Sequence, residues 1–460
     1  MQNYLTKFAT EAEYNEFIVS NDCPYINTSY IQETDEVMYL KDEIDTYQAQ
    51  PFTVHIDRLS NGNSVPLCFL VQQDPTFSRV QSYCRYKINN NDWETFTFTF
   101  NDGTWKGDDN VRLYEGDTVQ IICKTNTFFG ITASREKYDL QCSISGNIMS
   151  LFFGDDFVYA PANKLPFPQI PYDAYGNKIE HIHIGNPVDA PLIDASDLWL
   201  PTKNLPEGIF KEMFYNCVDL TAGPDIKAKY LPKEACVDMF YNCSSMTDMP
   251  LILTETVEEA ALDGMFRGCS SLVNTTQLHV KKIYGGFGNW MFNGCSSLVT
   301  APVWDEDVEL IDMTYNYNWF DWIFGDCSSL EDLSTWNIRF NNISAYNPIL
   351  FHAALGGCTS LTNTPYWGLT YAASDDVFLE TFIDDPWGHG WAPIDTMYFL
   401  FTTGKIDGGE GFQNVAQTGT IYLKTGSRYL PDGDLYGQLP CNLPSGWTVA
   451  EYVDPNTSNQ

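Results

Sequence analysis

Seven aromatic residues in the C-terminal half of the chain have the type and spacing expected of a recognition surface. Four lie in MTYNYNWFDW (313–322), one follows CTSL (358–361), and two lie in DDPWGHGWAP (384–393). They are Tyr315, Tyr317, Trp319, Trp322, Trp367, Trp387 and Trp391. Exposed rings interleaved with Asp and Asn would suit stacking on sugar rings, and partner interfaces are also enriched in Trp and Tyr. The alternative is that these rings cover the protein's own irregular segments, since large aromatics are usually partly buried.

Motifs for catalysis do not occur in the sequence. There is no GxSxG, none of the six histidines stands in a motif with Ser or Cys, and Gly404-Lys405 lacks the glycines of a phosphate loop. Acidic pairs such as Asp155-Asp156 and Asp384-Asp385 could serve glycoside hydrolysis, which needs two carboxylates about 5–10 Å apart. With 60 acidic residues, however, such pairs arise by chance. We therefore expect no catalytic residue, no enzyme activity and no cofactor.

Two weak metal candidates remain. His181 and His183 in EHIHIG would point to the same face of a strand, and a homotrimer would bring six such rings together on an ion. Asp432-Gly-Asp434 and the other acidic clusters could bind Ca²⁺. The more ordinary interpretation is an edge strand's solvent face for the histidines and a solvated surface for the carboxylates.

Composition limits the partners. The chain has 460 residues, 44% hydrophobic and 15% aromatic, which is typical of a folded protein of several domains. Its net charge of −35 would repel nucleic acid and anionic membrane surfaces. No apolar run approaches a membrane helix, and the N-terminus as written lacks a secretory signal. The 13 cysteines include no CxxC pair, so we interpret them as reduced thiols of a protein made in a cytosol.

An internal repeat is the strongest pattern in the sequence. Units such as MFYNCSSM, MFRGCSSL and MFNGCSSL place a cysteine every 26 residues, with two later intervals of 32 and 31. A fixed period in this range is typical of a solenoid whose coils stack their apolar residues into ladders. The predicted ladder residues are Cys217, Cys243, Cys269, Cys295, Cys327, Cys358, Met239, Met265, Met291, Leu272, Leu298, Leu330 and Leu361.

These units resemble the BspA-like leucine-rich repeat family, in which MFxGCxSL is followed by a proline, as at Pro250, Pro302 and Pro365. The resemblance covers about residues 190–410 and implies a leucine-rich-repeat solenoid. SISGNIMSLFFGDDF (143–157) resembles the linker before such repeats in proteins of gut Bacteroidales and their phages, and PSGWTV (444–449) resembles their terminal cap. The stretch 313–322 departs from the regular unit, so we expect it to project as a loop.

The remaining regions complete a mainly β architecture. Residues 51–158, with strand-like FTVHID (52–57), TFTFTF (95–100) and DTVQIICK (117–124), suggest a β-sandwich, and the linker resemblance implies an Ig-like one. Residues 415–460, with GTIYLKTG (419–426), would form a C-terminal β cap and tail. Residues 1–45 predict a small α+β anchor, with a helix from Thr10 and a hairpin over 28–40. We expect Tyr14, Phe17, Tyr30, Met38 and Tyr39 to anchor it on a partner.

Three functions can be weighed. The N-terminal module resembles modules on structural proteins of Bacteroidales phages, including crAss-like ones, which implies a non-enzymatic virion protein: a head fibre, capsid decoration or tail fibre. Residues 1–45 would then bind other virion proteins, and the repeats would bind a host cell-surface glycan or protein. The alternatives are a bacterial surface adhesin of the BspA-like family, which would need an export signal, and a glycan depolymerase.

Overall fold

The computed structural model describes most of the upstream β region and most of the repeats. The described residues are 6–8, 27–33, 36–42, 50–60, 64–67, 72–73, 83–96, 99–101, 104–106, 110–124, 139–153, 157, 184, 190–202, 205–304, 308–311, 319–333, 336, 339–341, 353–369, 393–399, 415–423, 425–436, 438 and 443–453. Within them the fold is mainly β, with one short helix, which confirms the predicted class. No helix in these ranges has the length and apolar character to cross a bilayer.

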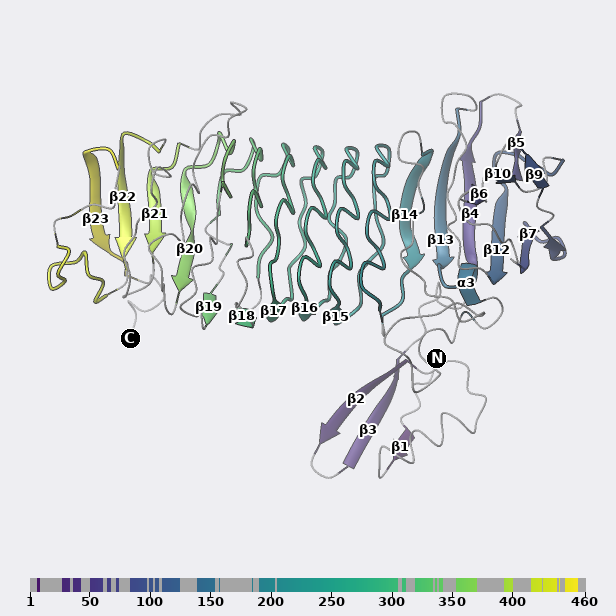
Figure 1. Ribbon diagram of the computed structural model, residues 1–460, viewed down its shortest axis with the longest axis horizontal. Coiled ribbons are helices and arrows are strands. Elements are labelled where there is room, and N and C mark those ends of the chain that lie inside the picture. The colour runs from purple at the N-terminus through teal and green to yellow at the C-terminus, as the bar shows by residue number, and fades with distance from the viewer. Residues whose placement is uncertain are drawn as a thin grey trace.

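A three-stranded antiparallel sheet precedes the rest of the fold (Figure 1). Its strands are β1 (Thr6–Phe8), β2 (Asn27–Glu33) and β3 (Glu36–Asp42), in the order β1-β3-β2. Glu33 pairs with Glu36, so the chain reverses between them and the hairpin predicted over 28–40 is confirmed. The helix predicted from Thr10 lies outside the described residues.

The next region is built on a six-stranded sheet in the order β14-β13-β4-β12-β7-β8. Its strands are β4 (Phe52–Arg58), β7 (Tyr83–Ile88), β8 (Glu94–Thr95), β12 (Thr118–Lys124), β13 (Gln141–Asn147) and β14 (Leu192–Trp199). Two small antiparallel sheets accompany it: β5 (Val65–Pro66) with β11 (Arg112–Leu113), and β6 (Gln72–Gln73), β10 (Thr104–Lys106) and β9 (Thr99–Asn101). The short helix α3 (Ser150–Phe153) is fixed to β12, because Ser150 Oγ donates a 2.9 Å hydrogen bond to the Ile121 carbonyl.

The strands predicted at 52–57 and 117–124 correspond to β4 and β12, but the prediction of one strand over 95–100 is wrong. Thr95 ends β8, whereas Thr99 begins β9 in a different sheet. Phe96 turns into the core between them, where its ring lies 4.7 Å from that of Tyr86. Strict alternation along TFTFTF indicated strand character but could not show that the stretch is shared by two sheets.

Cys84 and Cys123 form a disulfide, so the interpretation of all cysteines as reduced thiols is wrong. The two residues face each other across neighbouring antiparallel strands, β7 and β12, with Cα atoms 4.1 Å apart. The eight other described cysteines are free and buried. An odd total of 13 concealed this pair, because the disulfide joins residues 39 positions apart that only the sheet brings together.

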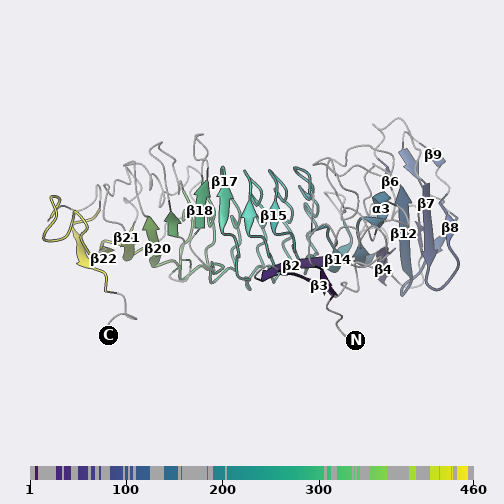
Figure 2. The same cartoon turned by 90° about the horizontal axis from the view of Figure 1, so that it is seen from below.

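Each repeat contributes one coil to a stack (Figures 1 and 2), and a nine-stranded parallel sheet runs along that stack. Neighbouring strands pair in order of sequence, one from each successive coil. They are β15 (Tyr230–Leu231), β16 (Thr256–Val257), β17 (Lys282–Tyr284), β18 (Val308–Ile311), β19 (Arg339–Asn341), β20 (Asn363–Leu369), β21 (Thr396–Phe399), β22 (Thr418–Leu423) and β23 (Gly446–Glu451). β22 and β23 coincide with the strand predicted at 419–426 and with PSGWTV.

The interior of the stack consists of side-chain ladders. Phe214, Phe240, Phe266, Phe292 and Phe324 stack face to face, with successive ring centroids 5.3–5.6 Å apart. All the predicted ladder residues are fully buried, which confirms that part of the prediction. Each thiol from the second coil onward donates a hydrogen bond of 3.0–3.2 Å to the carbonyl of the ladder phenylalanine one coil earlier. Cysteine is thus both a small apolar side chain and a weak donor here.

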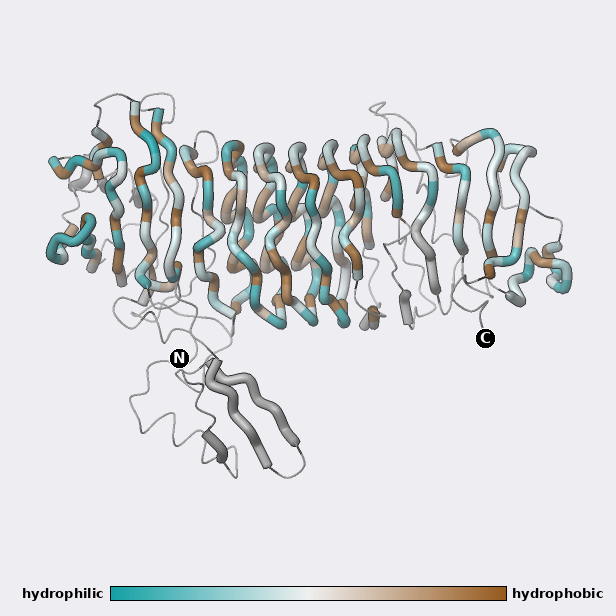
Figure 3. The backbone as a smooth tube through the Cα atoms, turned by 180° about the vertical axis from the view of Figure 1, so that it is seen from behind, coloured by the Kyte–Doolittle hydropathy of each residue, from teal (hydrophilic) through white to brown (hydrophobic). Residues whose placement is uncertain are grey.

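The six-stranded sheet and the coils form one continuous body. β14, which lies in the predicted repeat region, pairs in parallel with β13 of the upstream sheet. It also bonds to the first coil, because Ala195 N–H donates to the Ala222 carbonyl at 2.9 Å. Buried apolar residues form a single cluster from Phe52 to Trp447, and hydrophobic and hydrophilic residues alternate along the coils (Figure 3). Every coil is therefore covered on its N-terminal side, the first coil by β14 and each later coil by the coil before it.

Candidate recognition surface

Five side chains of successive coils form a partly exposed stack, which we call the aromatic column: Tyr215, Tyr241, Arg267, Trp290 and Trp322. The two tyrosine rings are stacked with centroids 4.6 Å apart. The Arg267 guanidinium carbon lies 5.5 Å from the Tyr241 ring centroid and 4.4 Å from that of Trp290. The two indoles are stacked at 5.2 Å. One row of π and cation–π contacts therefore crosses five coils.

The repeat sequence explains this arrangement. Tyr215, Tyr241 and Arg267 follow the Met-Phe pair in their units, whereas Trp290 and Trp322 precede the corresponding Met291 and Ile323. The column residue therefore follows the Met-Phe pair up to Arg267, and from Trp290 onward it precedes the corresponding pair. The coils supply the spacing, because Phe240 N–H bonds to the Met265 carbonyl and Phe266 N–H to the Met291 carbonyl at 2.9 Å each. A rigid backbone ladder thus sets the separation of the rings.

Both tryptophans have left-handed backbone conformations, which bulky residues rarely adopt. Their φ angles are 60° at Trp290 and 52° at Trp322. The equivalent positions in the three preceding coils, Glu212, Asp238 and Gly264, also have positive φ. A left-handed conformation costs a non-glycine residue roughly 1–2 kcal/mol. The left-handed turn is therefore a regular part of each coil, and the two tryptophans place large aromatic rings at that turn.

Gly325 provides the space for the Trp322 ring. A Cβ atom added to Gly325 would lie 2.5 Å from Cε3 of Trp322 and 2.8 Å from Nδ2 of Asn293. The indole therefore lies against the backbone of its own coil on one edge while its face stacks on Trp290. Its orientation is fixed before any ligand arrives, which lowers the entropy cost of binding.

A polar ladder runs beside the two tryptophans. Asn289 donates from its backbone N–H to Asp263 Oδ1 at 3.1 Å and from Nδ2 to Asp263 Oδ2 at 2.9 Å. Asn289 Oδ1 in turn accepts from the Asp321 N–H at 2.9 Å. Burial raises the pKa of Asp263 to about 7, although the hydrogen bonds from Asn289 oppose this shift. Asn289 and Asp321 directly precede Trp290 and Trp322, so the ladder supports the backbone of both.

Arg267 is the positively charged residue of the column, and it forms no ion pair with the described residues. Among the described residues, its guanidinium makes only the two ring contacts, while nearby Lys211 and Lys233 pair with Glu234 and Glu259 at 2.8 and 2.9 Å. Asp238 feels the charge: burial raises the pKa of its carboxyl, and Arg267 partly counters that rise. Because the rings cover both faces of the guanidinium, its N–H edge is the part left to bind a ligand.

The seven aromatic residues predicted from the sequence have different outcomes. Trp322 belongs to the column. Trp319 is fully buried, so its prediction as an exposed binding residue is wrong. Residues 319–322 pair with 287–290 of the preceding coil, through Phe320 N–H to the Phe287 carbonyl and Trp290 N–H to the Asp321 carbonyl. They are thus a regular part of the coil rather than a projecting loop. Trp367 lies in β20, and Tyr315, Tyr317, Trp387 and Trp391 lie outside the described residues.

Other predicted site residues are placed only in part. Tyr30 lies in β2, and Met38 and Tyr39 lie in β3, where Tyr30 and Tyr39 pair directly. Tyr14 and Phe17 fall outside the described ranges, as do His181 and His183. Within the described ranges no cluster of three metal-ligating side chains occurs. Of the Asp432-Gly-Asp434 stretch, Asp434 accepts hydrogen bonds of 2.7 and 2.8 Å from Arg428, which lowers the pKa of that carboxyl.

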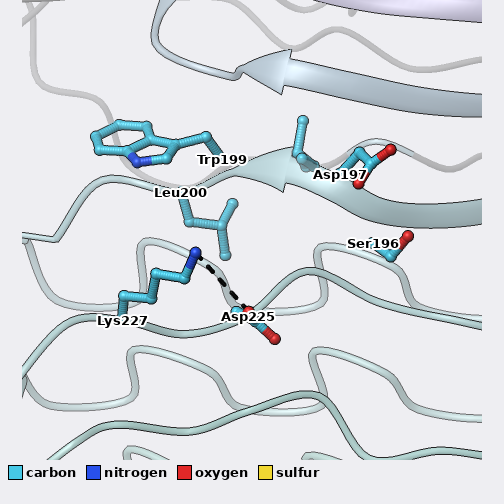
Figure 4. Close-up of a pocket in the computed structure, with 7 residues that line it drawn as sticks. Ser196, Asp197, Trp199, Leu200, Asp225 and Lys227 are labelled. Carbon is cyan, nitrogen blue, oxygen red and sulfur yellow. Dashed lines mark ion pairs between the residues drawn. The ribbon is translucent and has the colours of Figure 1, made fainter. Parts of the chain in front are cut away.

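A depression at the junction of β14 and the next coil is a second place where a ligand could fit (Figure 4). It has a volume of about 190 Å³, and its wall includes the ion pair between Lys227 and Asp225, 3.8 Å apart. Ligand pockets usually measure about 300–1,000 Å³. This depression is smaller than that range, and its cation already faces a carboxylate, so the aromatic column is the stronger candidate.

Sequence reasoning missed Tyr215, Tyr241, Arg267 and Trp290. The signal was present, because the third residue of the MFYNC, MFYNC and MFRGC units is Tyr, Tyr and Arg, and Trp precedes MF and IF in the next two. Comparison of the chain with models of protein families, with curated proteins and with solved structures gave no match.

Proposed function

We propose that this protein is a non-enzymatic structural component of a phage particle that binds a host cell-surface glycan or protein through the aromatic column. The observation that carries the recognition role is the partly exposed, stacked pair Trp290 and Trp322. Tyr, Trp and Arg are the residue types that dominate binding energy at interfaces. The resemblance of the repeats to BspA-like leucine-rich repeats supports a solenoid of that type as the scaffold.

The proposed place on a particle, as head fibre, capsid decoration or tail fibre, rests on the resemblance of residues 1–45 to phage modules. Many copies on one particle would convert weak single contacts into avidity. The Cys84–Cys123 disulfide fits this proposal, because disulfides persist on virion and cell surfaces. It fits a bacterial surface adhesin of the BspA-like family equally well, and that remains the second candidate.

Quantitative mass spectrometry of gradient-purified phage particles, beside the envelope fraction of uninfected cells, tests the proposal. We expect the protein to co-purify with particles, with a copy number that separates a decoration from a tail fibre. Recovery only in envelopes would replace the virion role by the adhesin role. A binding assay on host cells tests the surface itself: Trp290→Gly should reduce binding, and full binding by this variant would show that the column is not the recognition surface.

A further inference from the structure

We propose that the aromatic column binds an extended acidic polysaccharide, with Arg267 holding the carboxylate of one sugar unit. This inference rests on the proposed recognition function and names its ligand class. Three properties of the described residues support it: the free edge of the guanidinium, the direction in which the rings present their edges, and the repeat distance along the column.

The charge argument starts from the fixed position of Arg267. Its guanidinium lies between the rings of Tyr241 and Trp290, so the side chain loses little further freedom when it binds. Carboxylates match the fork of N–H groups on a guanidinium and accept two parallel hydrogen bonds from it. The lysines on the neighbouring coils are neutralised by Glu234 and Glu259. An acidic group is therefore drawn to Arg267 rather than to the rest of this surface.

The aromatic rings, like Arg267, favour an electron-rich or acidic ligand. Tyr215 and Tyr241 are stacked within 6° of parallel, and Trp290 and Trp322 within 5°, so neighbours cover each other's faces and the edges point outward. Aromatic edges carry partial positive charge, and tyrosine hydroxyls and indole N–H groups can donate hydrogen bonds. An electron-rich surface of hydroxyl and carboxylate oxygens complements such a row of donors.

The repeat distance separates a glycan from an acidic peptide. Successive members of the column are 4.4–5.5 Å apart, close to the length of one sugar unit in an extended chain. An extended peptide places side chains on the same side about every 6.6 Å, because residues rise 3.2–3.4 Å and alternate in direction. A peptide strand would lose register after one or two contacts, whereas a polysaccharide could meet each coil in turn.

The protein's net charge of −35 does not oppose this contact at short range. At physiological ionic strength, interactions between exposed charges are largely screened beyond about 8 Å. Repulsion from distant carboxylates therefore slows the approach of an acidic chain without cancelling the direct contact at Arg267, although the nearby half-buried carboxyl of Asp238 offsets part of the guanidinium charge. Affinity should consequently depend on the local guanidinium–carboxylate pair.

The test uses the full chain, three acidic polysaccharides and a neutral counterpart of one of them. Binding is measured by calorimetry in 0.15 M salt to polygalacturonate, alginate and hyaluronate, and to fully methyl-esterified polygalacturonate as the neutral counterpart. We expect binding to at least one acidic polymer and loss of binding on esterification. Arg267→Gln should weaken it roughly 10- to 100-fold, and Arg267→Lys should restore only part of the loss. Arg58→Gln, which removes the same charge from an exposed pair with Asp139, is the matched control and should bind normally.

Several outcomes would overturn the inference. They are binding to none of the acidic polymers, equal binding of the esterified polymer, or unchanged affinity in Arg267→Gln with an unchanged melting temperature. Equal binding of poly-glutamate would identify an acidic peptide as the occupant instead. If the protein still binds host cells through Trp290 in any of these cases, the recognition function stands and only the ligand class falls. If it binds neither cells nor polymers, both proposals fall.

Discussion

Trp322 and Gly325 lie three residues apart in one coil, and the indole of the first occupies the space that a side chain on the second would need. Gly325→Ala should therefore push the Trp322 ring off its stack with Trp290. The partly exposed ring can move outward, but the new Cβ would also crowd Nδ2 of the buried Asn293, so we expect a loss of stability of about 1–3 kcal/mol. Host-cell binding should fall clearly, as measured beside thermal unfolding. Undiminished binding would show that the position of the Trp322 ring does not matter.

Trp319 and Trp322 should respond in opposite ways to removal of their rings. Trp319→Ala would empty a fully buried site and should lower the free energy of unfolding by about 3–5 kcal/mol. Trp322→Gly relieves a left-handed φ of 52°, and this gain offsets part of the lost stacking, so stability should change by about 1 kcal/mol or less. Urea denaturation and cell binding of both variants separate the two roles. Equal destabilisation would place Trp322 in the core as well.

The cysteine ladder offers a test of packing. Cys269→Ala removes the sulfur between coils and its 3.2 Å hydrogen bond to the Phe240 carbonyl. That carbonyl still accepts from the Cys243 N–H at 3.1 Å, so the cost is mainly the small cavity, about 1–2 kcal/mol. Cys269→Ser keeps a donor of similar size and should cost less than Cys269→Ala in urea denaturation. The reverse order would mean that apolar character outweighs the hydrogen bond.

Thiol chemistry should also report on the coils. Burial raises the pKa of Cys217 and Cys269 to about 12, so neither is a thiolate at pH 8. Since the thiolate is the reactive form, native protein should label slowly with iodoacetamide at both positions, and labelling should become rapid in denaturant. Mass spectrometry of the labelled peptides checks this. Fast labelling of the native protein would contradict the closed interior.

Asp263 should make stability depend on pH. Its pKa is raised from 3.8 to about 7 in the folded state, first by burial and also by the nearby charge of Asp238, against hydrogen bonds from Asn289. Between these two values the folded state binds more protons than the unfolded state, so the free energy of unfolding falls as pH rises from about 4 to 7. This contribution is fully present below pH 4 and lost above pH 7.

Asp263→Asn measures that contribution. The advantage of the wild type over this variant in urea denaturation should be larger at pH 4.5 than at pH 8, by on the order of 1–3 kcal/mol. A difference that stays constant across pH would show that Asp263 titrates normally. Comparison with Asp248→Asn, an exposed carboxylate that Thr247 and Asn274 keep at a lowered pKa, controls for the general effect of removing a charge.

The repeat interior could be predicted from sequence because it depends on one property, the 26-residue period. Cys243, Met265 and Leu272 recur in register, and stacking in register is all that their burial requires. Trp319 and Trp322 show where such reasoning ends. Trp319 is buried and Trp322 is partly exposed, and the local sequence WFDW does not show which of the two rings enters the core. The Cys84–Cys123 pair likewise depends on strand order, which no local pattern encodes.

The parallel pairing of β13 with β14 determines how mechanical load would pass through the protein. Each coil touches only its neighbours, so a pull on ligand bound at the column would travel coil by coil toward the N-terminal attachment proposed for residues 1–45. The coils between Trp322 and β14 and the disulfide-braced sheet beyond them would carry the tension. Strands β20 to β23 lie on the C-terminal side of the aromatic column and would bear none of this tension. Under the proposed function, the part of the protein that would have to withstand shear is therefore the N-terminal part, where the repeats are most regular.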